Sequence, residues 1–136
     1  MENITVRKTP CPSCPYRRDV PSGIWEESEY AKLPGYDGDI PDQVAAGAFG
    51  LFYCHQRTGE LCAGWVGCHD MGCSLATRLH FDKLDPSALD YESPVPLFSS
   101  GAEAAEHGRR DLKRPGVSAE AMIGKLRRLR AAKDDW

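Results

Sequence analysis

The sequence predicts a small α+β protein, mostly helical and loop-rich with a minor β-hairpin, organised around a Cys-ligated metal site. Three observations lead there. The chain has 136 residues, enough for one modest core. Its 13 glycines and 10 prolines interrupt every long periodic segment. Its six cysteines and four histidines gather mainly in two short stretches.

The N-terminal third is expected to begin extended over residues 1–10. The run Cys11-Pro-Ser-Cys-Pro15 then forms a tight loop, because its two prolines fix φ. A helix is predicted from an N-cap at Ser22 to Leu33, where Pro34-Gly35 ends it. A polar loop over 35–43 and a helical turn over Val44–Ala48 follow.

The middle of the chain carries the expected hairpin. Phe49–Cys54 is the best strand, the turn over Arg57–Glu60 reverses the chain, and residues 61–65 return beside the strand. A helix is predicted over Ser74–Phe81. The segment before it is expected to be less regular, because three glycines weaken a helix there.

The last third alternates short helices and loops. A short helix begins at Asp85, residues 93–98 are extended, and residues 101–107 form another helix. The clearest helix starts at an N-cap on Ser118, with Val117 and Met122 placed as a hydrophobic staple. Its apolar stripe follows helical spacing and consists of Met122, Ile123, Leu126 and Leu129.

The cysteines indicate metal binding in a reducing compartment. No apolar run approaches the ~20 residues of a membrane span, and the N-terminus lacks the apolar core of a secretory signal. We therefore expect a cytoplasmic protein whose thiols stay reduced, where clustered cysteines point to metal or redox chemistry.

Cys11 and Cys14 form a C-x₂-C knuckle, which brings two sulfurs to one ion. A dithiol redox motif has the same spacing but lies between a strand and a helix, whereas here Pro15 follows at once. Cys54 and Cys62 flank the predicted turn and complete a four-cysteine site, with His55 as the substitute for Cys54.

A rival ligand set lies further along. His69 and Cys73 would share one face of a helix, and Cys68 is adjacent. On a continuous helix Cys62 and Cys73 would be about 16 Å apart and could not share an ion. Cys68 and Cys73 are equally well explained as small buried side chains, and His69 as a hydrogen-bonded residue beside Asp70.

Charge divides the chain into a Cys/His-rich core, residues 1–108, and a basic C-terminal helix, residues 109–136. The core carries 8 Lys/Arg against 16 Asp/Glu, whereas residues 109–133 carry 9 basic and 2 acidic residues. The helix could bind an acidic protein or nucleic acid, pack on the acidic core, or simply face solvent. Contact residues for a partner would be Lys125, Arg127, Arg128 and Arg130.

Three blocks resemble an uncharacterised cysteine-rich family of actinobacteria and their phages, with the pattern CPxCP…FxCH…CAGWxxCHDM. They are residues 11–25, residues 52–56 with 62–71, and residues 96–104, so the resemblance covers most of 10–108. It implies a small protein of a bacterial cell or a phage-infected host, with cysteines as metal ligands. It implies no activity.

No nucleophile elbow, phosphate loop, dinucleotide fingerprint or zinc-protease helix is present. The expected function is therefore an intracellular zinc-binding structural or interaction module without catalytic activity. A [4Fe–4S] cluster protein, acting as a redox sensor or transcription-associated regulator, is the alternative. A thiol-dependent enzyme using Cys11 or Cys14 is the third possibility.

Overall fold

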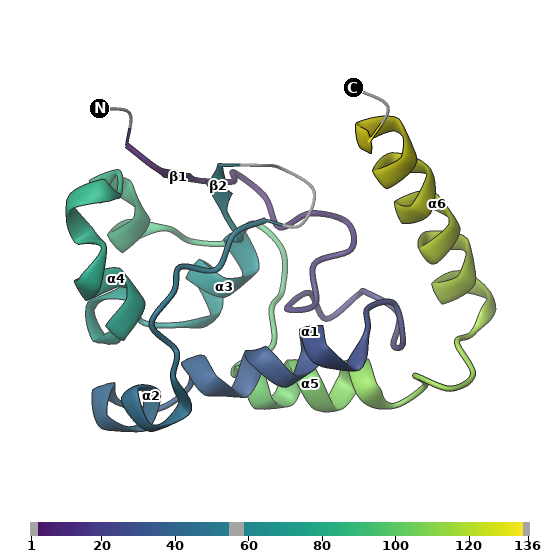
Figure 1. The fold of residues 1–136 in the computed structure, drawn as a ribbon, viewed down its shortest axis with the longest axis horizontal. Helices are drawn as coiled ribbons and strands as arrows, with labels where there is room; N and C mark the ends of the chain where they lie inside the picture. The colour runs from purple at the N-terminus through teal and green to yellow at the C-terminus, as the bar shows by residue number, and fades with distance from the viewer. Residues whose placement is uncertain (1–2, 55–58, 135–136) are drawn as a thin grey trace.

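The computed structural model describes residues 3–54 and 59–134, and about half of these are helical (Figure 1). The strands are β1 (Thr5–Val6) and β2 (Glu60–Leu61). The α-helices are α1 (Glu27–Lys32), α2 (Ile40–Ala46), α3 (Ala63–Cys68), α4 (Leu75–Leu79), α5 (Gly101–Arg109) and α6 (Val117–Asp134). Single 3₁₀ turns are η1 (Leu33–Tyr36), η2 (Met71–Cys73), η3 (Phe81–Lys83) and η4 (Pro86–Asp90).

The strands β1 and β2 pair in parallel, with Thr5 opposite Glu60 and Val6 opposite Leu61. The predicted hairpin is reduced to an antiparallel bridge between Tyr53 and Leu61. Leu61 therefore has a backbone partner on each side, one from the N-terminal segment and one from the 52–54 arm. The predicted extended segment over residues 1–10 contains β1, but its pairing was not predicted because the partner strand lies more than fifty residues away.

The first helix begins later than predicted, after Glu26 rather than at Ser22. Gly23 has φ of 81°, a left-handed conformation that a right-handed helix cannot contain, and Ser22 is buried in the core. Helical geometry also continues past the predicted stop, because Pro34 occupies the first turn of η1, where its missing N–H has no role.

The second helix begins at Ile40, before the single turn predicted over 44–48. Asp39 and Asp42 form a reciprocal capping box, and Gly47 ends the helix in the left-handed conformation. The helix predicted from Ser74 is confirmed as α4, with the Ser74 hydroxyl accepting a hydrogen bond from Thr77 N at 3.3 Å.

Two features of the last third differ from the prediction. The segment after Asp85 is a 3₁₀ turn, and α6 begins at Val117, so Ser118 lies inside the helix. Val117 is 88% exposed, so no hydrophobic staple forms. The helix packs on the body through Ala119 and Leu126, which are buried.

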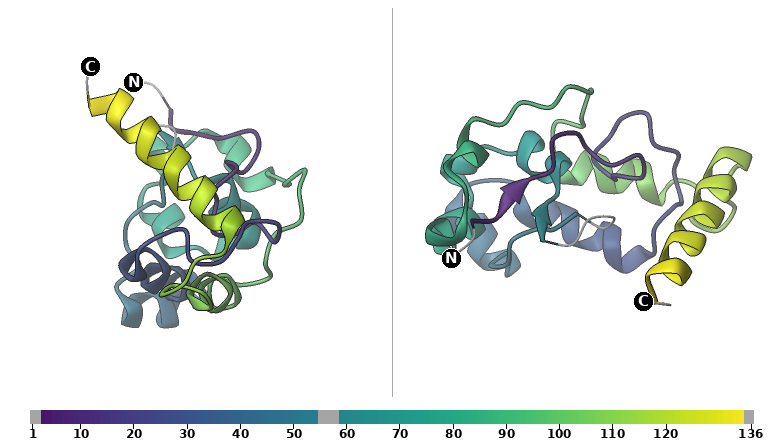
Figure 2. Two further views of the ribbon diagram at one scale, coloured as in Figure 1. Left: turned by 90° about the vertical axis from the view of Figure 1, so that its right-hand side faces the viewer. Right: turned by 90° about the horizontal axis from the view of Figure 1, so that it is seen from above.

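The core lies above α1 and α5, which run side by side along one edge, while α6 stands at the end of the molecule (Figures 1 and 2). Gly108 lets α5 approach this closely, because a Cβ there would overlap the Tyr30 ring. No helix in residues 3–54 or 59–134 is both long and apolar enough to cross a membrane.

Candidate metal centre

Four buried cysteines from three distant segments meet at the centre of the fold. The Sγ atoms of Cys14 and Cys62 lie 3.7 Å apart, and the Cys11 thiol forms hydrogen bonds with Cys14 and Cys54. The four cysteines are between 0% and 7% exposed. They are the four that the knuckle and the turn predict.

The Cys11–Cys14 loop is held by its own backbone. Cys14 N donates to Cys11 O at 2.9 Å, and Arg17 N donates to Cys14 O at 3.1 Å, so two consecutive turns place both thiols on the inner side. The Trp25 indole donates to Ser13 O at 2.8 Å and fixes the loop from the body side.

Cys54 and Cys62 are positioned by the short antiparallel pairing. Cys54 N donates to Glu60 O at 2.9 Å, and Cys62 N donates to Phe52 O at 2.9 Å. Cys62 is also the N-cap residue of α3. Gly64, in the first turn of that helix, allows the helix to contact the knuckle directly, because a Cβ at this position would overlap Cys14 Sγ.

Hydrogen-bond donors surround three of the four sulfurs. Arg7 Nη1 donates to Cys54 Sγ at 3.6 Å, and the Ser13 hydroxyl lies 3.7 Å from Cys11 Sγ. The backbone N–H of Tyr16 donates to Cys14 Sγ. Arg7 could not be predicted from its surroundings in the sequence, because its position depends on the long-range pairing of β1 with β2. Ser13 lies between the two knuckle cysteines, but no sequence motif marks it as a partner of a cysteine sulfur.

Mutual contact and burial raise the pKa values of Cys11 and Cys14 when no cation is present. The hydrogen bond with Cys14 raises the pKa of Cys11, and burial adds to the rise. For Cys14, the bond with Cys11 lowers the pKa, but contact with Cys62 and burial outweigh it and leave the pKa well above its usual value. A nearby positive ion would reverse this preference.

The rival set is not assembled. His69 Nε2 lies 3.0 Å from Asp37 Oδ1 and its Nδ1 lies 2.9 Å from Trp65 O, so both ring nitrogens are engaged. The helix expected to join His69 and Cys73 ends at Cys68, because His69 adopts an extended conformation. Cys73 is exposed on η2. Burial raises the pKa of half-buried Cys68 to about 12.

The remaining predicted residues are His55 and four cations of the last helix. His55 lies outside the described residues. Lys125, Arg127 and Arg128 are exposed on α6, and the surroundings of the Arg130 side chain are not described. In the described part of the chain, no three His, Cys, Asp or Glu side chains already surround a common ion position. The four thiols instead contact one another in pairs: Cys62 with Cys14, Cys14 with Cys11, and Cys11 with Cys54.

Comparison with known proteins places the chain in a family but adds no activity. A family model, the family of unknown function DUF6283, matches residues 6–130. No curated protein and no solved structure matches the chain. The expectation of an uncharacterised family is confirmed, whereas its cysteine pattern and its occurrence in actinobacteria and phages stay predictions.

Proposed function

The chain belongs to the DUF6283 family, and since that family has no assigned function, we propose one from the cysteine cluster. We infer that this protein is an interaction module whose fold is held by a single zinc ion. The ligands are the thiolates of Cys11, Cys14, Cys54 and Cys62.

The separation of the Cys14 and Cys62 sulfurs carries the proposal. Tetrahedral zinc binds thiolates at about 2.3 Å, which sets neighbouring ligand sulfurs about 3.8 Å apart. The two sulfurs lie 3.7 Å apart, so this pair needs no rearrangement to span one edge of the tetrahedron. Cys11 contacts both Cys14 and Cys54, and zinc binding would require the Cys11 and Cys54 side chains to turn toward the ion.

The donors around the sulfurs support bound thiolates rather than thiols. Hydrogen bonds to a charged acceptor are the strong ones, and metal ligands are usually oriented by such outer partners. The guanidinium of Arg7 also offsets part of the negative charge that four thiolates place on one divalent ion.

Four protein ligands leave zinc no open position for water or substrate, so the proposed role is structural. The ion would join the N-terminal loop, the 52–54 arm and the start of α3. Regular strand pairing in this region is limited to a two-residue sheet and one bridge. Zinc binding would therefore contribute directly to the free energy of folding.

The alternatives fit the geometry less well. In a [4Fe–4S] cluster each cysteine binds a different iron, so ligand sulfurs lie further apart than those of Cys14 and Cys62. A catalytic thiol is partly exposed and has a lowered pKa. Cys11 and Cys14 are buried and their pKa values are raised.

Metal analysis of the purified chain tests the proposal. We expect one zinc per chain, a colourless protein under anaerobic purification, and no zinc after Cys14→Ser. Cys73→Ser is the matched control, because this exposed cysteine lies outside the cluster and its loss leaves the zinc in place. A brown protein that contains iron would refute the zinc proposal and support the [4Fe–4S] alternative. Equal metal loss in both variants, or no metal in the intact protein, would refute the four-cysteine assignment.

A further inference from the structure

We propose that one end of the molecule binds the phosphodiester backbone of nucleic acid without regard to sequence. The surface, here called the basic end, comprises the exposed cations of the α5–α6 connection and of α6: Arg109, Arg110, Lys113, Arg114, Lys125, Arg127 and Arg128. It does not include the cysteine cluster, and the proposal is independent of zinc.

The cations of the basic end are largely uncompensated. Residues 109–128 carry seven Lys/Arg and only two carboxylates, Asp111 and Glu120. Among partners in the described part of the chain, the ion pair formed here is that of Arg109 with Glu27, at 2.7 Å. This contrasts with the acidic remainder of the protein and gives the molecule a strong charge asymmetry.

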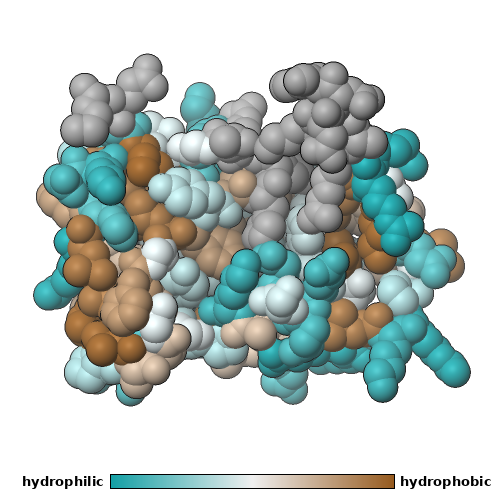
Figure 3. Space-filling view, viewed as in Figure 1, coloured by the Kyte–Doolittle hydropathy of each residue, from teal (hydrophilic) through white to brown (hydrophobic). Residues whose placement is uncertain are grey.

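Packing determines that these charges face outward. Ala119 and Leu126 are buried against the body, so the opposite side of α6 faces solvent and carries Lys125 and Arg128. Hydrophilic side chains gather over α6 and the connection at this end of the space-filling view (Figure 3). At about 1.5 Å per residue, the 18 residues of α6 extend about 27 Å, a length along which duplex DNA presents many phosphates.

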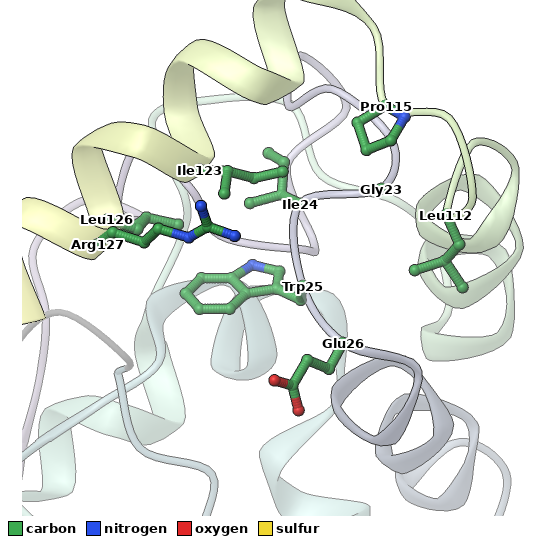
Figure 4. A pocket seen from close by; sticks show the side chains of 9 residues that line it. All are labelled: Gly23, Ile24, Trp25, Glu26, Leu112, Pro115, Ile123, Leu126 and Arg127. Atoms are coloured by element: carbon green, nitrogen blue, oxygen red, sulfur yellow. The ribbon is translucent and has the colours of Figure 1, made fainter.

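The surface is also hollowed beside its cations. A cavity of about 530 Å³ is lined by four of these cations, Arg109, Arg110, Lys113 and Arg114, together with Glu27 and Asp111. A second groove, of about 330 Å³, lies between α6 and the Trp25 segment. There the Arg127 guanidinium extends over the Trp25 ring (Figure 4). Both recesses are large enough for a phosphate group.

The chemistry favours nucleic acid over other anionic partners. Five of the seven cations are arginines, whose guanidinium fork matches phosphate oxygens. A membrane-surface helix needs an apolar face free for lipid, whereas α6 uses Ala119 and Leu126 to dock on the body. Residues 109–128 contain no aromatic side chain, so base stacking does not contribute and recognition is limited to the backbone.

Fluorescence anisotropy with labelled duplexes of 20 base pairs tests the proposal. DNA and RNA duplexes of one sequence, and a scrambled sequence, are titrated at 50 and 200 mM salt. We expect binding at low salt, equal for both sequences and weakening steeply with salt through counterion release. The variant Lys113→Gln/Arg114→Gln/Arg128→Gln should bind DNA on the order of tenfold or more weakly, with a shallower salt dependence.

The matched control removes the same charge elsewhere, as Lys8→Gln/Lys32→Gln/Lys83→Gln, and should bind as the intact protein does. All three proteins are first compared by circular dichroism, melting temperature and zinc content, which these exposed changes leave unaltered. No binding at 50 mM salt, equal weakening in both variants, or binding of polyglutamate in preference to the duplexes would overturn the proposal. The last result would identify an acidic protein as the partner.

Discussion

At Gly64, the absence of a Cβ decides how closely α3 packs on the cysteine loop. A methyl group there would overlap Cys14 Sγ and the Cβ of Tyr16, both fully buried. We expect Gly64→Ala to lower the free energy of unfolding by about 1–3 kcal/mol, the usual cost of overpacking a core. It should also weaken zinc binding, because Cys14 must move.

Urea denaturation with a zinc titration measures both effects. Gly50→Ala is the matched control, because a Cβ at Gly50 meets no atom within 4 Å and its φ is not positive. Similar stability and zinc affinity in the two variants would show that α3 does not press on the cysteine cluster.

The side chain of Arg7 is the clearest outer partner of the proposed site. It donates to Cys54 Sγ, so Arg7→Gln should reduce zinc affinity about 10- to 100-fold, the usual cost of losing such a partner. Competition with a chromophoric chelator gives the affinity. Lys8→Gln removes the same charge from the adjacent, exposed position and should leave the affinity unchanged. If both variants lose affinity equally, only net charge matters.

The pairing of the four cysteines could be predicted because each pair is local. A two-residue spacer joins Cys11 to Cys14, and Cys54 and Cys62 flank a segment for which the sequence predicts a turn. Arg7 could not be predicted, since it reaches Cys54 only after the N-terminal segment has paired with residues 60–61. Short-range spacing is encoded in the chain itself, whereas this contact is a product of the tertiary fold.

Among the elements, η1, α3 and α5 are joined by one carboxylate. Asp37 Oδ1 accepts from Gly101 N at 2.7 Å and Oδ2 accepts from Ala102 N at 2.8 Å, at the start of α5. Its Oδ1 also lies 3.0 Å from His69 Nε2, just after α3. Asp37 therefore satisfies two amides at a helix end and engages a histidine from another segment.

Asp37→Ala should accordingly destabilise the protein by about 1–3 kcal/mol, because the Gly101 and Ala102 amides lose a charged acceptor and His69 loses its partner. Chemical denaturation measures the change. Asp90→Ala, at an exposed position at the end of η4, controls for the loss of a surface carboxylate and should have little effect. A comparable loss in the two variants would mean that Asp37 contributes only its charge.

Element boundaries were predicted well where the capping residue is local, and poorly where tertiary packing decides. Ser74 caps α4 as its position indicates. The first helix begins late because Gly23 packs against the backbone of Asp111 in a left-handed conformation, a contact across nearly ninety residues. The staple at Val117 fails for a related reason, since α6 starts two residues early and leaves Val117 in solvent.

At the scale of the whole molecule, the sequence shows an acidic core and a basic C-terminal segment. Whether the basic side chains face solvent depends on how α6 docks on the body. Burial of Ala119 and Leu126 docks α6 on the body and leaves Lys125 and Arg128 exposed, whereas Arg109 forms an ion pair with Glu27 of the body. The contact between the two cysteine pairs likewise depends on the fold, which brings Cys62 within 3.7 Å of Cys14.

Proton binding links the cysteine cluster to the stability of the entire fold. The pKa values of Cys11 and Cys14 are raised in the metal-free protein above the ordinary thiol value of 9.0. The folded state therefore keeps protons that the unfolded chain releases. This contribution to stability is complete below the unfolded pKa and is lost as pH rises through the higher folded pKa values.

The metal-free protein should thus lose stability as pH rises above about 8, whereas zinc affinity should rise with pH, because zinc displaces the thiol protons. Melting temperatures of chelator-treated and zinc-loaded protein, measured from pH 6 to 10 under reducing conditions, should diverge. Lysines and tyrosines also titrate in this range, so the variant Cys11→Ser/Cys14→Ser is the reference. Zinc should not raise its melting temperature, and its stability should fall less than that of the intact protein at alkaline pH, because these two thiols are absent. If the intact protein and this variant give the same profile with and without zinc, these thiols neither bind the metal nor hold the protons that their burial implies.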